Sequence, residues 1–275
     1  MFGRRSVLAV VAGAALLIAA CGGDDDPTST PTVDATAEAT GEATGSAEAE
    51  ATATASRTPF PAPTPDPRTP EEIEEAARLR DAERTQRFIA RDYPLNNFDV
   101  ATVELWEILP LLPRDGIRSI DSPNFDTIEE ANAWLDDSEP VIAFELNGEA
   151  RAYPLQILTW HEIVNDVVGG EPVIVTYCPL CNTAIAFSRV VDGETREFGV
   201  SGALRRNDLI MYDRETETLW QQITGEAIVG EPAGSQLDFL TSQIVSWGDF
   251  RDSFPEATVL NRETGRAVNY GENPY

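Results

Sequence analysis

The composition of this chain changes near residue 70, and that change limits where a folded core can form. Residues 22–69 consist mainly of Ala, Thr, Glu, Pro and Asp, with Phe60 as their only aromatic residue. Such a segment buries too little apolar surface to offset the entropy lost on ordering, so we predict a disordered tether over residues 21–69. Any hydrophobic core must therefore come from residues 70–275.

The start of the core segment predicts a helix. Thr69-Pro70-Glu71-Glu72 combines a capping box with a proline at the first helical position. The residues that follow are mostly polar, with acidic side chains first and arginines later, as the helix dipole favours. We therefore predict a lead-in helix over residues 70–92, followed by a single globular domain over residues 93–275.

Short apolar runs separated by turns dominate the globular domain. Residues 141–146 and 149–153 flank Asn147-Gly148, a dipeptide that favours a two-residue type I′ hairpin turn. Residues 154–164 have a helical pattern, and residues 173–177 are typical of a buried strand.

Further strands are expected downstream, and regular alternation of strands and helices is absent. They are predicted at residues 184–190, 196–200, 209–212, 218–223, 227–229, 236–240 and 258–260, with one short helix at 247–254. The predicted fold class is α+β: a mostly antiparallel β sheet or open barrel with a few short helices, preceded by the disordered linker.

The N-terminal residues indicate export. Arg4 and Arg5 precede an apolar run over residues 7–20, which is too short to span a bilayer core of about 30 Å. The run ends in Ile18-Ala19-Ala20-Cys21, which resembles a bacterial lipobox. We predict a signal peptide over residues 1–20 and lipidation of Cys21, which would anchor the protein to the outer face of the cell membrane. In a cell with two membranes, the location would be periplasmic or at the outer membrane; both the general secretory and the twin-arginine routes fit.

Charge and composition exclude several kinds of function. All 20 basic residues are arginine, so no mechanism that needs a lysine is available. Residues 70–275 carry a net charge of −22, and a surface this acidic repels phosphate backbones. We expect no nucleic-acid partner; the sequence identifies neither a protein partner nor a reaction.

Two cysteines and one histidine stand out as candidate ligands. Once Cys21 is assigned to the lipid, Cys178 and Cys181 remain as a C-x-x-C pair. His161, the only histidine in the chain, precedes Cys178 by 17 residues. A C-x-x-C turn brings two sulfurs together, which suits a metal ion or a reversible disulfide equally well.

Several motifs around these residues resemble those of the bacterial family called domain of unknown function 3179. The motifs are Trp160-His161-Glu162-Ile163-Val164-Asn165-Asp166, Thr176-Tyr177-Cys178-Pro179-Leu180-Cys181, Phe198-Gly199-Val200-Ser201-Gly202, Asp208-Leu209-Ile210-Met211-Tyr212-Asp213 and Leu219-Trp220. The resemblance extends from about residue 93 to residue 260. It implies an extracytoplasmic setting but no established activity.

We favour a metal site built from Cys178, Cys181 and His161, with Met211 or a carboxylate such as Asp208 as the fourth ligand. Two thiolates and an imidazole suit zinc, and a thioether in place of a carboxylate would favour copper. A second layer of Glu162, Asp166 or Asp208, or a backbone carbonyl, should orient the histidine.

Two alternatives remain open at this stage. One is thiol–disulfide exchange on a fold unlike thioredoxin, because the chain turns at Asp192-Gly193, too soon after Cys181 for the helix that a thioredoxin fold requires. The other is a non-catalytic ligand- or partner-binding module in which the cysteine pair is structural.

Replacing Cys21 tests the predicted anchor. Cys21→Ala should move the protein from the membrane fraction to the soluble fraction, because no other segment of the sequence predicts an anchor. Fractionation followed by immunoblotting measures this, with Cys178→Ala as a control that keeps Cys21. If the Cys21→Ala variant stays with the membrane, the lipoprotein prediction is wrong.

Overall fold

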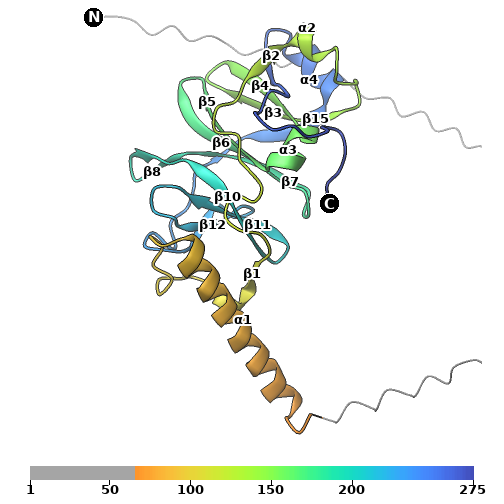
Figure 1. Ribbon diagram of the computed structural model, residues 1–275. Coiled ribbons are helices and arrows are strands. Elements are labelled where there is room, and N and C mark those ends of the chain that lie inside the picture. Colours follow the sequence, from red (N-terminus) through yellow and green to blue (C-terminus); the bar gives the residue numbers. More distant parts are fainter. Residues whose placement is uncertain (1–65) are drawn as a thin grey trace, which may run out of the picture. The chain divides into compact units, whose positions relative to one another are not determined.

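The structure, a computed structural model, describes residues 66–275 (Figure 1). The predicted signal peptide (1–20), Cys21 and residues 22–65 of the predicted tether lie outside the described residues. Among the residues that are described, no helix is both long and apolar enough to cross a membrane.

Helix α1 (Pro70–Asp92) begins with the capping box expected from the sequence. The Thr69 hydroxyl accepts a hydrogen bond from the Glu72 backbone N–H, and the Glu72 carboxylate accepts one from the Thr69 N–H. The first turns project away from the domain (Figure 1), and only residues late in the helix, such as Phe88 and Ile89, are buried. The helix is thus held to the domain by its last turns.

Three β-sheets form the body of the domain, and their strands come from different parts of the chain. The first has the order β1 (Ile108–Pro110), β10 (Phe198–Arg205), β11 (Asp208–Asp213), β12 (Leu219–Gln221) and β13 (Glu226–Val229). The second has the order β14 (Phe239–Leu240), β7 (Thr183–Ser188), β6 (Glu171–Cys178) and β5 (Ile163–Val168). The third has the order β15 (Ser242–Ser246), β3 (Pro140–Leu146), β4 (Glu149–Pro154), β16 (Thr258–Leu260) and β2 (Phe125–Thr127).

The remaining elements are short. They are α2 (Ile128–Ala131), α3 (Leu155–His161), α4 (Trp247–Ser253), the hairpin β8 (Val190–Val191) and β9 (Glu194–Thr195), and a 3-10 helix at Leu105–Glu107. Every paired strand in the described part is antiparallel to its neighbour except β4 and β16. The predicted α+β class with mostly antiparallel sheets is confirmed, and one of the sheets is a half-barrel.

The hairpin of β3 and β4 has the turn expected from its sequence. Leu146 pairs with Glu149, so the connection is Asn147-Gly148, and both residues have positive φ angles of 52° and 82°. The two-residue turn therefore sets the register of this hairpin, as a type I′ turn does.

The helix predicted over residues 154–164 is shorter in the structure. It ends at His161 because Glu162 has a φ of 60°, which no α-helix accommodates. Ile163 and Val164 then begin β5, where their β-branched side chains are completely buried. Tertiary pairing with β6 thus overrides the helical pattern, as is common for apolar runs of this length.

A buried apolar cluster joins the first and second sheets. It combines Ile174 and Phe187 from the second sheet with Val200, Leu209 and Trp220 from the first. Because both sheets contribute to one core, the loops at their adjoining edges are held in a defined relation to each other.

Two glycines with similar φ angles test how tightly β10 packs against the loop that follows β1. Gly148 (φ 82°) has open space around the position of a Cβ atom, whereas at Gly202 (φ 81°) a Cβ would lie 2.3 Å from the Leu112 carbonyl oxygen. Gly148→Ala should destabilise the protein by about 1 kcal/mol, the cost of a left-handed backbone. Gly202→Ala should cost a further ~1–3 kcal/mol for the steric overlap.

Urea denaturation of the two variants measures the difference. Equal losses of unfolding free energy would show that the loop carrying Leu112 yields without cost, contrary to the expected rigid contact.

Candidate functional site

The two cysteines of the C-x-x-C pair lie at a hairpin turn in the second sheet. Cys178 is the last residue of β6 and pairs with Thr183, the first residue of β7, so Cys181 lies in the tight connection between them. The Cys178 side chain is buried, and Cys181 is half-buried. Both are free thiols.

Asp208 brings a carboxylate to the two sulfurs. It is the first residue of β11, in the neighbouring sheet, and it is 3% exposed. The Cys181 thiol donates to Asp208 Oδ1 over 3.3 Å, and one ligand atom from each of Cys178, Cys181 and Asp208 lies within 4.8 Å of the others. Two thiols and a carboxylate therefore converge on one point.

Neighbouring groups hold the Asp208 carboxylate in this orientation. Its Oδ2 accepts hydrogen bonds from the Gln221 side-chain amide over 2.5 Å and from the Ile223 backbone N–H over 3.0 Å. Because these two donors occupy Oδ2, Oδ1 is the oxygen that faces the thiols. Such outer contacts orient a ligand before a metal arrives.

The Cys181 sulfur also contacts the first member of a buried polar chain. It lies 2.9 Å from the Thr183 hydroxyl, which donates to the Gln222 side-chain oxygen over 2.9 Å. The Gln222 amide in turn donates to the Thr176 hydroxyl over 2.9 Å, and Gln222 is completely buried. Gln222 directly follows β12 of the first sheet, so these contacts tie the Cys181 turn of the second sheet to the first.

Burial controls the protonation of Cys178. Loss of hydration, followed by the effect of the adjacent Cys181, raises the pKa of the Cys178 thiol to about 12. The Cys178 thiol is therefore protonated at neutral pH, and a bound cation would have to displace its proton.

The structure does not bring His161 to the cysteines. Its Nδ1 lies 2.7 Å from the Arg118 carbonyl oxygen and its Nε2 lies 2.7 Å from the Tyr270 hydroxyl. A carbonyl can only accept, so Nδ1–H donates to Arg118 and Nε2 accepts from Tyr270. His161 is outside the cysteine–aspartate group, and both of its ring nitrogens are already used.

Burial also keeps His161 neutral. Desolvation lowers the pKa of the imidazole, and the charge of Arg266 lowers it further, against the effect of the Arg118 carbonyl. A buried, neutral histidine with two hydrogen bonds is a structural residue that ties residues 118 and 270 together, which explains its position without a metal.

The other sequence-predicted residues are dispersed. Met211 is completely buried in the same apolar cluster as Cys178. Asp166 pairs with Arg151 and accepts from the Tyr153 hydroxyl over 2.6 Å, so it belongs to a separate polar contact. Glu162 accepts from the Tyr275 hydroxyl. Neither Glu162 nor Asp166 hydrogen-bonds the His161 ring, whose partners are the Arg118 carbonyl and the Tyr270 hydroxyl.

Sequence reasoning missed the residues that orient the site. Gln221 and Gln222 are polar residues that directly continue the buried Leu219-Trp220 segment, and that pattern is the signal that could have drawn attention to them. Thr183 follows the C-x-x-C turn by two residues and carries no such signal.

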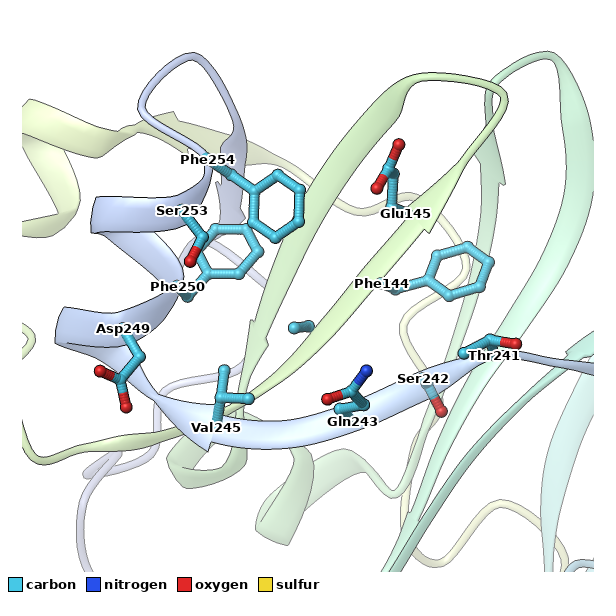
Figure 2. Close-up of a pocket in the computed structure, with 11 residues that line it drawn as sticks. Phe144, Glu145, Thr241, Ser242, Gln243, Val245, Asp249, Phe250, Ser253 and Phe254 are labelled. Atoms are coloured by element: carbon cyan, nitrogen blue, oxygen red, sulfur yellow. The ribbon is translucent and has the colours of Figure 1, made fainter. Parts of the chain in front are cut away.

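A wider groove lies elsewhere and lacks this chemistry. It has a volume of about 520 Å³ and is formed by β3, β15 and α4. Figure 2 shows the ring of Phe250, in α4, and that of Phe254, just after α4, on one side of the groove. Asp249 and Glu145 are its only acidic lining residues. No cysteine or histidine lines it, so the cysteine–aspartate group remains the candidate site.

Comparison with known proteins identifies the family. Residues 114–275 match the family described as "Protein of unknown function (DUF3179)", and this match covers more than half of the chain. The chain matches no curated protein and no solved structure. The matched range includes the C-x-x-C turn, Asp208 and both glutamines, and the chain belongs to the DUF3179 family.

Proposed function

We propose that this protein binds a metal ion through Cys178, Cys181 and Asp208. The observation that carries the proposal is the convergence of two sulfurs and one carboxylate oxygen within 4.8 Å. Ligand atoms around a tetrahedral zinc ion lie about 3.5–4 Å apart, so only a small closure is needed. Asp208 takes the place that the sequence suggested for His161.

The donor set favours zinc over copper. Thiolates bind both Zn²⁺ and Cu⁺, but a carboxylate is a harder ligand and suits Zn²⁺ better. Three protein ligands leave a fourth position for water or another molecule, as in zinc sites that act on a substrate. Copper bound through the sulfurs alone is the second outcome that the experiment distinguishes.

The proposal includes the setting expected from the N-terminal sequence. The protein would be exported and anchored to a membrane through a lipid on Cys21, with residues 22–69 as the spacer. Outside the cell, unprotected thiol pairs tend to oxidise, and a bound metal is one way to prevent this. The lipobox-like Ile18-Ala19-Ala20-Cys21 sequence supports this part of the proposal.

Thiol–disulfide exchange is the alternative that the adjacent sulfurs also favour. It needs a thiolate that attacks a disulfide, and cations beside a cysteine normally stabilise that thiolate. Here burial raises the pKa of Cys178, and the group beside both sulfurs is a carboxylate. This environment opposes thiolate formation unless a metal is bound.

Metal content and the effect of single substitutions test the proposal. The full chain carrying Cys21→Ala has only the two site thiols, and purified under reducing conditions it should contain one zinc per chain. Co²⁺ in its place should give a sulfur-to-metal charge-transfer absorption. Cys178→Ser should abolish binding, and Gln221→Leu, which removes one of the two donors to Asp208 Oδ2, should weaken it about tenfold.

His161→Gln and Asp208→Asn form the decisive pair. Asp208→Asn keeps the shape of the side chain but removes its charge, and it should weaken metal binding strongly. His161→Gln should leave the affinity unchanged, because the imidazole is not among the ligands. A chain without metal whose two cysteines titrate as a reversible disulfide would favour the redox alternative, and an inert disulfide would favour a structural role.

A further inference from the structure

Glu162 holds an unusual position that the proposed metal site does not use. It ends α3 with φ 60° and ψ −30°, a conformation that side-chain-bearing residues rarely adopt. Its side chain is 6% exposed, although a carboxyl group strongly prefers water. Backbone strain of this kind costs about 1–3 kcal/mol and concentrates at sites where a side chain must be aimed in one direction.

The Glu162 side chain lines a small cavity with apolar walls. The cavity has a volume of about 70 Å³, and Glu162 and Tyr275 are the only lining residues with polar side chains. The remaining walls include Leu111, Leu112, Leu180 and Leu209. A carboxyl and a phenol at one end of an apolar space are the features of a small ligand pocket.

The two polar groups leave hydrogen-bonding capacity for a ligand. The Tyr275 hydroxyl donates to Glu162 Oε1, and within residues 66–275 no hydrogen bond reaches Oε2. Burial raises the pKa of Glu162 to about 7, although the Tyr275 hydrogen bond acts in the opposite direction. In mildly acidic solution the carboxyl therefore carries a proton that it can donate.

The mouth of the cavity is apolar and open. Leu111, Leu112 and Leu180 line the cavity and are 58%, 43% and 51% exposed, respectively. Three exposed leucines around one opening form a surface on which an aliphatic chain can pack. The cavity itself has room for only a few heavy atoms, so a longer chain would remain at this surface.

We propose that the cavity binds the head group of a neutral aliphatic molecule, a ketone or an alcohol, whose chain lies over Leu111, Leu112 and Leu180. The carbonyl or hydroxyl oxygen would accept a hydrogen bond from the Glu162 carboxyl. Carboxylate and phosphate heads are disfavoured, because the pocket contains an acid and the net charge of residues 70–275 is −22. A cationic head would lose its hydration among the leucines with one acid to replace it.

This pocket is separate from the metal ligands but borders them. Leu180 lies between the two cysteines, and Leu209 follows Asp208, yet neither cysteine lines the cavity. Tyr275 lies near enough to Cys178 that the cysteine contributes to raising the pKa of its phenol. The pocket can therefore bind a ligand whether or not a metal is present, and the two proposals can fail independently.

Binding of 7-fluoroheptan-2-one to the full chain, followed by ¹⁹F NMR, tests the pocket. We expect saturable binding at pH 6 that weakens about tenfold by pH 8, because a carboxyl with a pKa of about 7 loses its proton over this range. Glu162→Gln keeps an N–H donor, so it should bind the ketone with no such pH dependence. Tyr275→Phe should move the midpoint to higher pH, because the tyrosine hydrogen bond lowers the pKa of Glu162.

Two leucine variants show where the chain of the ligand lies. Leu112→Ser should weaken binding several-fold, whereas Leu95→Ser, at a leucine that is 67% exposed but lies outside the pocket, should have no effect. Circular dichroism checks that each variant is folded. The proposal fails if wild-type binding is absent or independent of pH, if both serine variants act alike, or if 7-fluoroheptanoate binds more tightly than the ketone.

Discussion

The side-chain amide of Asn165 links the two sheets between which the cysteine site forms. Asn165 lies on β5 in the second sheet, and its amide donates to the Phe198 carbonyl on β10 over 2.7 Å. Its carbonyl oxygen accepts from the Phe198 N–H over 2.9 Å, and its amide also donates to Asp121 over 2.7 Å. One buried side chain thereby replaces a pair of backbone hydrogen bonds across the junction, in addition to the shared apolar core.

The candidate site depends on this junction because its parts come from both sheets. Cys178 and Cys181 belong to a turn of the second sheet, while Asp208 and its partner Gln221 belong to the first. A small slip of one sheet past the other would separate the carboxylate from the sulfurs. Rigid sheets are suited to holding such a group, since ligand positions must agree to a fraction of an ångström.

The left-handed conformation of Glu162 separates two neighbouring side chains. His161 reaches Arg118 and Tyr270, whereas Glu162 lines the cavity with Tyr275. Both therefore contact the last residues of the chain, although through different partners. If the helix continued through Glu162, the two side chains would not reach these different partners. The strained backbone at Glu162 therefore allows His161 to contact Arg118 and Tyr270 while Glu162 lines the cavity.

The sequence by itself determined the local features of this protein. The capping box before α1 and the Asn147-Gly148 hairpin depend on residues a few positions apart, and the structure has both. The fold class followed from short strands without alternating helices, and the family followed from motifs within single segments. The C-x-x-C pair also converges by chain proximity alone.

Only the tertiary structure decided which third group meets the two sulfurs. His161 was the natural choice from the sequence because a lone histidine near a cysteine pair is a common ligand pattern, but hydrogen bonds to Arg118 and Tyr270 direct it elsewhere. Asp208 is 27 residues from Cys181 and reaches it because the start of β11 in the first sheet meets the β6–β7 turn of the second. Such contacts depend on how sheets pair and pack, and no spacing between residues along the chain encodes that arrangement.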